Sequence, residues 1–236
     1  MIKYFRKIRQ QLLKENKFSR YLFYAIGEIF LVVIGILIAM QINNLNKARI
    51  ENKEEIKTYK NIKRQILEDK NEIIKIKNFN SYFSNQFGYA NQIITEQDYK
   101  RIDTLAQITI NLSQYSDFHQ SGNIYETLVN SGDIQLLKNS DIVSNIQQLE
   151  MTYNQVNRLE DIHWEVIMEE FSPAIRGVIN YSNLKVVKPK IIYSVEIQNI
   201  FIECIILTKS KEAVYNKALD EINYLVELID YDLKLN

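Results

Sequence analysis

The sequence predicts an all-α protein, with a single transmembrane helix followed by an extracytoplasmic antiparallel helical bundle. The 236 residues include only six Gly and two Pro, too few for a β-sandwich or barrel, which turns every eight to twelve residues or so. Residues 21–42 form one apolar run. Apolar residues then recur at spacings of three and four over most of the remaining chain, which is typical of amphipathic helices.

Composition argues against several classes of protein. Lys+Arg and Asp+Glu both number 29 and 46% of residues are hydrophobic, so neither a disordered tail nor a globally basic nucleic-acid binder fits. One Cys and two His exclude disulfide scaffolds and most metal sites built from Cys or His. We therefore expect no nucleic-acid partner, no metal and no cofactor.

Residues 1–20 are predicted to be a cytoplasmic basic amphipathic segment. Glu15 is their only acidic residue, against seven basic ones, so this segment carries a charge of +6 and the rest of the chain −6. Apolar residues at helical spacing favour a helix on the membrane surface, although the same charges serve equally as a topology signal. The seven basic residues expected at the membrane surface are Lys3, Arg6, Lys7, Arg9, Lys14, Lys17 and Arg20.

Residues 21–42 are predicted to be the transmembrane helix. At roughly 1.5 Å per residue, this run spans a hydrocarbon core of about 30 Å. A buried helix of a soluble core rarely lacks polar side chains on every face, as Phe30 to Met40 does. A cleaved signal peptide fits poorly, because the basic region is long and Ala39-Met40-Gln41 is a poor cleavage site. We expect an uncleaved anchor in the lipid bilayer.

Charge on the two flanks of this run predicts its orientation. After the run, basic and acidic residues are interleaved, so the flank is nearly neutral, whereas the preceding flank is strongly positive. Positive flanks stay in the cytoplasm, so the N-terminus is expected there and residues 43–236 outside it. The only cysteine, Cys204, lies in an apolar run and is expected to be a buried, inert thiol.

Small residues and one carboxylate mark the predicted span. Gly27, Leu31, Gly35 and Ala39 repeat every four residues, a spacing that lets two helices approach closely. Glu28 lies beside this stripe. It is either a helix-packing group, which would favour self-association, or an interfacial carboxylate that headgroup water and Lys17 or Arg20 can reach.

Two stretches carry a resemblance to a known family. The run IGEIFLVVIGILIAMQINNLN begins at Ile26, and Tyr125-Glu126-Thr127-Leu128 leads into Ser131-Gly132-Asp133-Ile134 and Leu136-Leu137-Lys138-Asn139. The chain resembles an uncharacterised family of bacterial single-span membrane proteins, a domain of unknown function. This resemblance covers about a third of the chain and implies an anchored helical protein. Together with the predicted orientation, we expect it in the bacterial inner (cytoplasmic) membrane, with a periplasmic C-terminal domain.

The spacing of apolar residues predicts the helices of residues 43–236. The first continues from Asn44 to about residue 96, and short helices follow over 98–113 and 123–130, the latter ended by Gly132. Ser140 and Asp141 are expected to cap a helix that ends near Ser172-Pro173. Residues 181–190 are expected to be a surface loop, and 193–208 and 210–235 the last two helices.

Motifs for chemistry are sparse. Glu160-x-x-His163 has the spacing of a carboxylate-bridged metal site, but His119 does not supply a second copy, so we expect His163 and Trp164 to pack at the edge of the core. A Gly-rich phosphate loop, an HExxH motif and a Gly-x-Ser-x-Gly elbow are all absent from the sequence. Polar residues around His119 are expected to be ordinary loop residues. We predict no catalytic residues and no enzyme activity.

Two functional classes remain. The first is a membrane-anchored interaction or scaffold protein with an unknown protein partner. The alternative is a ligand-sensing bundle that signals through a separate membrane partner, because about 20 cytoplasmic residues cannot form an output domain. A pocket between helices lined by Tyr and Arg would favour sensing, whereas an exposed apolar patch would favour scaffolding.

Overall fold

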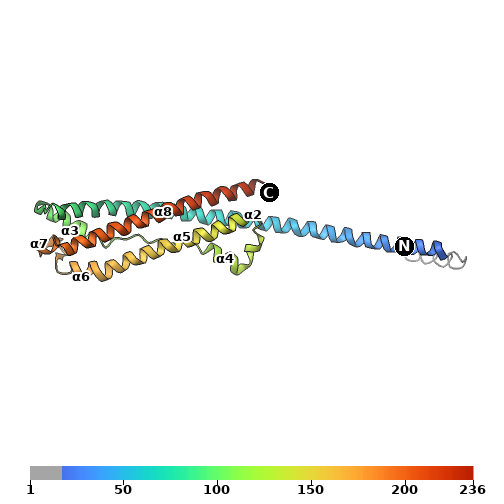
Figure 1. The fold of residues 1–236 in the computed structure, drawn as a ribbon, viewed down its shortest axis with the longest axis horizontal. Coiled ribbons are helices and arrows are strands. Elements are labelled where there is room, and N and C mark those ends of the chain that lie inside the picture. The colour runs from blue at the N-terminus through green and yellow to red at the C-terminus, as the bar shows by residue number, and fades with distance from the viewer. Residues whose placement is uncertain (1–17, 236) are drawn as a thin grey trace. The chain divides into compact units, whose positions relative to one another are not determined.

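The computed structural model describes residues 18–235 and confirms the all-α class (Figure 1). Its helices are α2 (Phe18–Thr95), η1 (Tyr99–Arg101), α3 (Ile102–Asn111), α4 (Ile124–Ser131), η2 (Asp133–Leu136), α5 (Ser140–Glu165), the π-helix η3 (Val166–Phe171), α6 (Ser172–Ile175), α7 (Pro189–Ile192) and α8 (Val195–Leu235). Strands β1 (Ile179–Asn180) and β2 (Lys185–Val186) form a small antiparallel hairpin. The chain divides into two compact units, residues 1–54 and 55–236.

The described part of the first unit is the N-terminal stretch of α2. An 18-residue window of this helix has a mean hydropathy of 2.4 and no buried residue, so one described helix is long and apolar enough to cross a membrane. Gly27 and Gly35 have no other described atoms where a side chain would begin, and Leu31 is exposed. Within the described part of the first unit, the predicted stripe is therefore uncovered.

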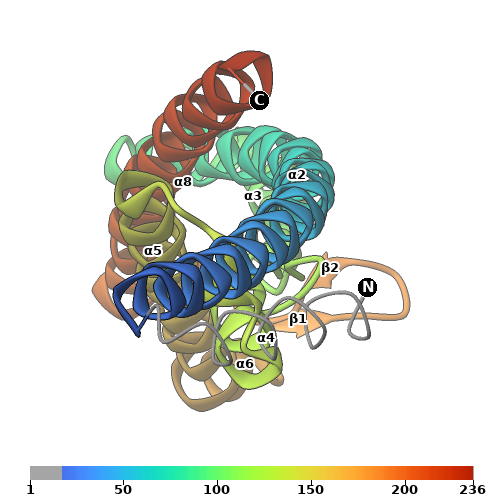
Figure 2. The ribbon, with the colours of Figure 1, turned by 90° about the vertical axis from the view of Figure 1, so that its right-hand side faces the viewer.

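The second unit is a bundle of three long helices, namely α5, α8 and the part of α2 from residue 55. Lys63 pairs with Asp230, while the Asn80 side chain donates to the Thr208 carbonyl at 2.8 Å, so α2 and α8 run antiparallel. α5 packs against α8. Figures 1 and 2 show these helices side by side.

Buried apolar residues form two separate core clusters along the bundle. One cluster contains Ile66 and Ile73 of α2, while the other contains Phe87 and, from α8, Phe201. Both clusters draw on α2, the α5–η3 run and α8. Each long helix therefore presents an apolar stripe that is interrupted once, between Ile76 and Phe87 on α2 for example.

Local polar groups and glycine account for several helix ends. Gly132 ends α4 in the left-handed conformation, with φ 78°, as predicted. The cap of α5 differs from the prediction: Asn139, not Ser140, accepts hydrogen bonds from the backbone N–H groups of Asp141 and Ile142. An asparagine oxygen performs this role as well as serine does.

The C-terminal half differs from the prediction in three places. Residues 195–235 form one helix instead of two, because Thr208 and Lys211 face the bundle interior while Lys209 and Ser210 face solvent, so the helix continues without a break. The helical run that begins with α5 continues through η3 and α6 and ends at Ile175, two residues beyond Pro173. The predicted loop 181–190 contains β2 and the start of α7.

Candidate functional site

A buried polar layer separates the two core clusters. Its charged members are Lys211 of α8, which is completely buried, and Glu160 of α5, which is 3% exposed. Side chains from all three long helices and from the segment that follows α3 make up the layer. These residues are Asn80, Ser84, Ser116, Glu160, His163, Thr208, Lys211 and Tyr215.

Hydrogen bonds link Lys211 to Glu160 through two hydroxyl groups. The Lys211 ammonium lies 2.8 Å from Ser116 Oγ, which is 2.7 Å from the Tyr215 hydroxyl, and that hydroxyl donates to Glu160 Oε1 at 2.6 Å. Because Tyr215 has one proton and gives it to Glu160, Ser116 donates to Tyr215 and accepts from Lys211. The two buried charges are thus connected by a directed chain of three hydrogen bonds.

His163 completes the layer on the other side of Lys211. Its Nδ1 atom lies 2.8 Å from the Lys211 ammonium, which has only protons to offer, so Nδ1 accepts and Nε2 carries the proton. Nε2 is buried without a hydrogen-bond partner. The imidazole is therefore held neutral in the interior, not at the edge of the core as predicted.

Burial shifts the pKa values of the layer. Desolvation lowers the pKa of Lys211 to about 8, although the charge of Glu160 opposes this change. The pKa of Glu160 is raised by burial, against the hydrogen bonds from Tyr215 and Phe118. Desolvation and the neighbouring Lys211 charge lower the pKa of His163 to about 3. Cys204, beside the layer, is buried as predicted, and desolvation raises its pKa to about 12.

His163 should make stability fall in mild acid. Its pKa is about 6.5 in an unfolded chain and about 3 in the fold, so only the unfolded state gains a proton between these values. His163 therefore leaves stability undiminished above about pH 6.5 and lowers it by about 1.4 kcal/mol per pH unit as the pH falls below that value. Urea unfolding of the full chain should therefore show a larger loss between pH 7 and pH 5 for the wild type than for His163→Gln. His119→Gln, at an exposed histidine, should behave as the wild type, and equal losses in all three would contradict the assignment.

Helical carboxylates hold the segment that crosses the layer. The backbone N–H of Phe118 donates to Glu160 Oε2 at 2.7 Å, and that of Ser121 donates to Asp69 Oδ1 at 2.6 Å. Further along, Glu55 of α2 accepts from the backbone N–H of Lys138 at 3.0 Å. The bonds from Phe118 and Ser121 fix residues 113–123, which we call the crossing segment and which have no helix or strand of their own, against α5 and α2.

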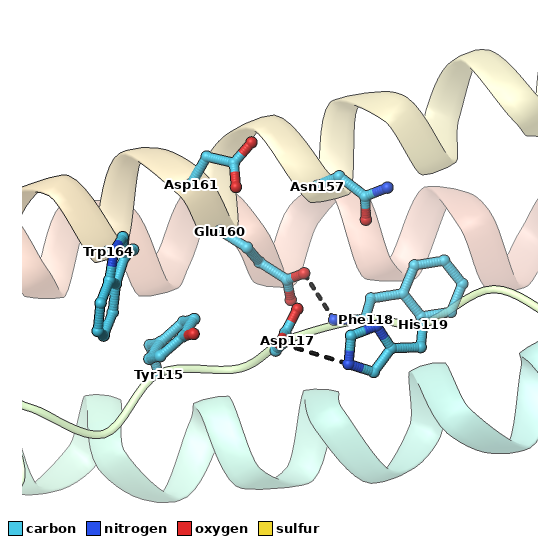
Figure 3. Close-up of a pocket in the computed structure, with 8 residues that line it drawn as sticks. All are labelled: Tyr115, Asp117, Phe118, His119, Asn157, Glu160, Asp161 and Trp164. Carbon is cyan, nitrogen blue, oxygen red and sulfur yellow. Dashed lines mark hydrogen bonds and ion pairs between the residues drawn. The ribbon is translucent and has the colours of Figure 1, made fainter.

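An open pocket lies between the crossing segment and α5, and it shares Glu160 with the polar layer (Figure 3). Its volume is about 430 Å³. Tyr115 and Trp164 lie together at one end, with ring centroids 5.3 Å apart, while Phe118 and His119 lie at the other. The lining residues, which define the acidic pocket, are Tyr115, Asp117, Phe118, His119, Asn157, Glu160, Asp161 and Trp164.

A second hollow adjoins the acidic pocket at Trp164, which lines both. Its volume is about 390 Å³ and its walls are mainly apolar. Met168 is 50% exposed and Tyr181 55%. We call this hollow the apolar groove, which is lined by Ile110, Ser113, Trp164, Ile167, Met168, Phe171, Ser172, Ile175 and Tyr181.

One face of the α5–η3 run contributes to both hollows. Asn157, Asp161, Trp164 and Met168 follow one another at spacings of four, three and four, so they lie along a single helical stripe. The stripe changes from polar to apolar at Trp164. It continues into the π-helix η3, a form that is rare and occurs often at functional sites.

Comparison with known proteins identifies the family. A family model described as "Family of unknown function (DUF6090)" matches residues 28–210, which is most of the chain. The chain belongs to the DUF6090 family. This match takes in most of the apolar stretch of α2 as well as both hollows, so it agrees with the uncharacterised family expected from the sequence. No curated protein and no solved structure matches the chain.

None of the residues predicted as sites in this DUF6090 chain is a member of the polar layer. Lys3, Arg6, Lys7, Arg9, Lys14 and Lys17 lie outside the described residues, and Arg20 lies in α2. Gly27, Glu28, Leu31, Gly35 and Ala39 all lie in the first unit. Self-association through this stripe therefore stays a prediction, as does each of the two roles of Glu28.

The functional candidates that sequence reasoning missed are Lys211, Tyr215 and Ser116. Lys211 and Tyr215 lie on the buried face of α8, where a lysine is exceptional, and their seven-residue spacing from Ala218 and Ile222 was the available signal. Glu160 and His163 stood out in the sequence only as a metal motif. Among residues 18–235, no group of three or more His, Cys, Asp or Glu side chains is arranged to hold a metal ion.

Proposed function

We propose that this chain is a membrane-anchored interaction protein whose bundle binds a protein partner outside the cytoplasm. The apolar stretch of α2 serves as the anchor, and the basic N-terminal segment keeps that end in the cytoplasm. Support for the anchor comes from the length of the stretch and from its lack of any buried residue. Soluble helices of this length normally bury one face.

One observation carries the proposal for the bundle: two hollows of about 430 and 390 Å³ adjoin at a half-exposed tryptophan. Trp, Tyr and Met are enriched at protein interfaces, because they supply large contact areas. Trp164, Met168 and Tyr181 supply such an area on one face. We call this face, made of the acidic pocket and the apolar groove, the recognition face.

A specific observation favours ligand sensing as the second candidate function. Glu160 lines the acidic pocket and also ends the hydrogen-bond chain from Lys211. A small molecule in the pocket could thus alter a charged group in the core. The pocket has the tyrosine expected for a sensing site, whereas none of its lining residues is an arginine.

Photo-cross-linking in native membranes tests the proposal. A photoreactive phenylalanine analogue replaces Met168 on the recognition face or, as the matched control, Tyr231, which is 63% exposed on α8 and lines neither hollow. We expect a discrete cross-linked protein band from position 168 and none from position 231. Equal cross-linking from both positions, or none from either, would contradict a recognition face.

A further inference from the structure

We propose that the recognition face binds a segment of a partner protein in which a lysine or arginine stands next to apolar side chains. This inference rests on the proposed function and specifies the chemistry of the partner. The basic side chain would occupy the acidic pocket, and its apolar neighbours would occupy the apolar groove. Charge, exposed apolar area and the continuity of the two hollows each support this assignment.

Charge in the pocket selects a cation. Asp117, Asp161 and Glu160 supply three carboxylates, and Asn157 adds a carbonyl oxygen that is buried without a hydrogen-bond partner. None of the lining residues is a lysine or arginine, and the one histidine, His119, lies 3.4 Å from Asp117. The pocket is therefore rich in carboxylate acceptors and lined by no lysine or arginine, which fits an ammonium or guanidinium group.

The aromatic wall suits the stem of a basic side chain as well as its charge. Tyr115 and Trp164 lie side by side, and Trp164 is 45% exposed. Tryptophan is the ring that attracts a cation most strongly, and its face also packs against the methylene groups of lysine or arginine. The acidic and the aromatic residues of the pocket thus both favour a lysine or arginine side chain.

The apolar groove extends the site beyond a single residue. Ile167 and Phe171 are buried beneath it, while Met168 and Tyr181 remain about half exposed. Exposed apolar side chains that gather in one patch are typical of an interaction site. Apolar side chains on the partner would bury this area.

Because the two hollows are continuous, they favour a peptide segment over a small cation as the occupant. Asp161, Trp164 and Met168 lie along one stripe of the α5–η3 run, so an occupant that covers both hollows must carry its charge next to its apolar part. A free amine would fill the acidic pocket alone and leave the groove exposed. The observations favour the segment.

Fluorescence of Trp164 provides a direct assay, because it is the only tryptophan in the chain. The full chain in an uncharged detergent would be titrated with a blocked hexapeptide of two lysines followed by leucine and phenylalanine residues. Two control peptides replace the lysines with glutamate or the apolar residues with serine. We expect a saturable change in Trp164 emission with the basic, apolar peptide only, and weaker binding at higher salt.

Matched substitutions locate the binding site. Asp117→Asn combined with Asp161→Asn should weaken binding about two- to thirtyfold, since each removes one partly exposed ion pair. Met168→Glu should also weaken binding, by burying a charge against the apolar residues. Asp220→Asn, at an exposed carboxylate of α8 outside both hollows, should leave binding unchanged. Circular dichroism of each variant checks that the helices are intact.

Several outcomes would overturn the inference. Equal binding of the glutamate peptide, or full binding by the double Asp→Asn variant, would exclude charge recognition. Equal binding of the serine peptide or of lysine amide alone would indicate a small-cation site instead of a docking surface. Cross-linking from position 168 without any peptide binding would leave the proposed function intact and exclude this partner chemistry.

Discussion

Glu160→Ala should destabilise the bundle by about 3–5 kcal/mol, the range measured when one partner of a buried charge network is removed. The substitution leaves the Tyr215 hydroxyl and the Phe118 backbone N–H without their acceptor. It also removes the negative charge that faces the buried Lys211 ammonium. Urea unfolding of the full chain in detergent, followed by circular dichroism, measures the loss.

Two further variants define the effect. Glu165→Ala removes an exposed carboxylate from the same helix and should change stability by no more than about 0.5 kcal/mol. Glu160→Gln keeps one acceptor oxygen and should lose less than Glu160→Ala does. A loss below about 1 kcal/mol for Glu160→Ala would mean that the polar layer does not hold the two core clusters together.

The helical architecture could be predicted from the sequence because it depends on local patterns. The end of α2 at Thr95 and the left-handed stop at Gly132 both follow from periodicity and glycine chemistry. The same use of local patterns divided residues 193–235 into two helices, with a break just after Thr208. A polar residue in a helix can mark the end of the helix or can face a buried polar layer. Which of the two occurs depends on residues far away in the sequence.

The candidate site could not be predicted because its members are distant in the chain. Ser116, Glu160 and Tyr215 meet only when the crossing segment, α5 and α8 pack together. Sequence reasoning treated Ser116 as loop polarity and Glu160 as part of a metal motif that lacked its second half. The stripe from Asp161 to Met168 was visible as helical spacing, but nothing local indicated that Tyr115 lies against it.

The orientation of the chain tests the account most directly, since the proposed partner lies outside the cytoplasm. The only cysteine, Cys204, is completely buried, so a cysteine introduced for the half-exposed Tyr224 is the one accessible thiol among the described residues. A membrane-impermeant maleimide is added to intact cells whose outer membrane has been permeabilised. We expect Tyr224→Cys to be labelled before lysis and the unmodified chain to stay unlabelled. Labelling of Tyr224→Cys only after lysis would place the bundle in the cytoplasm and contradict the account.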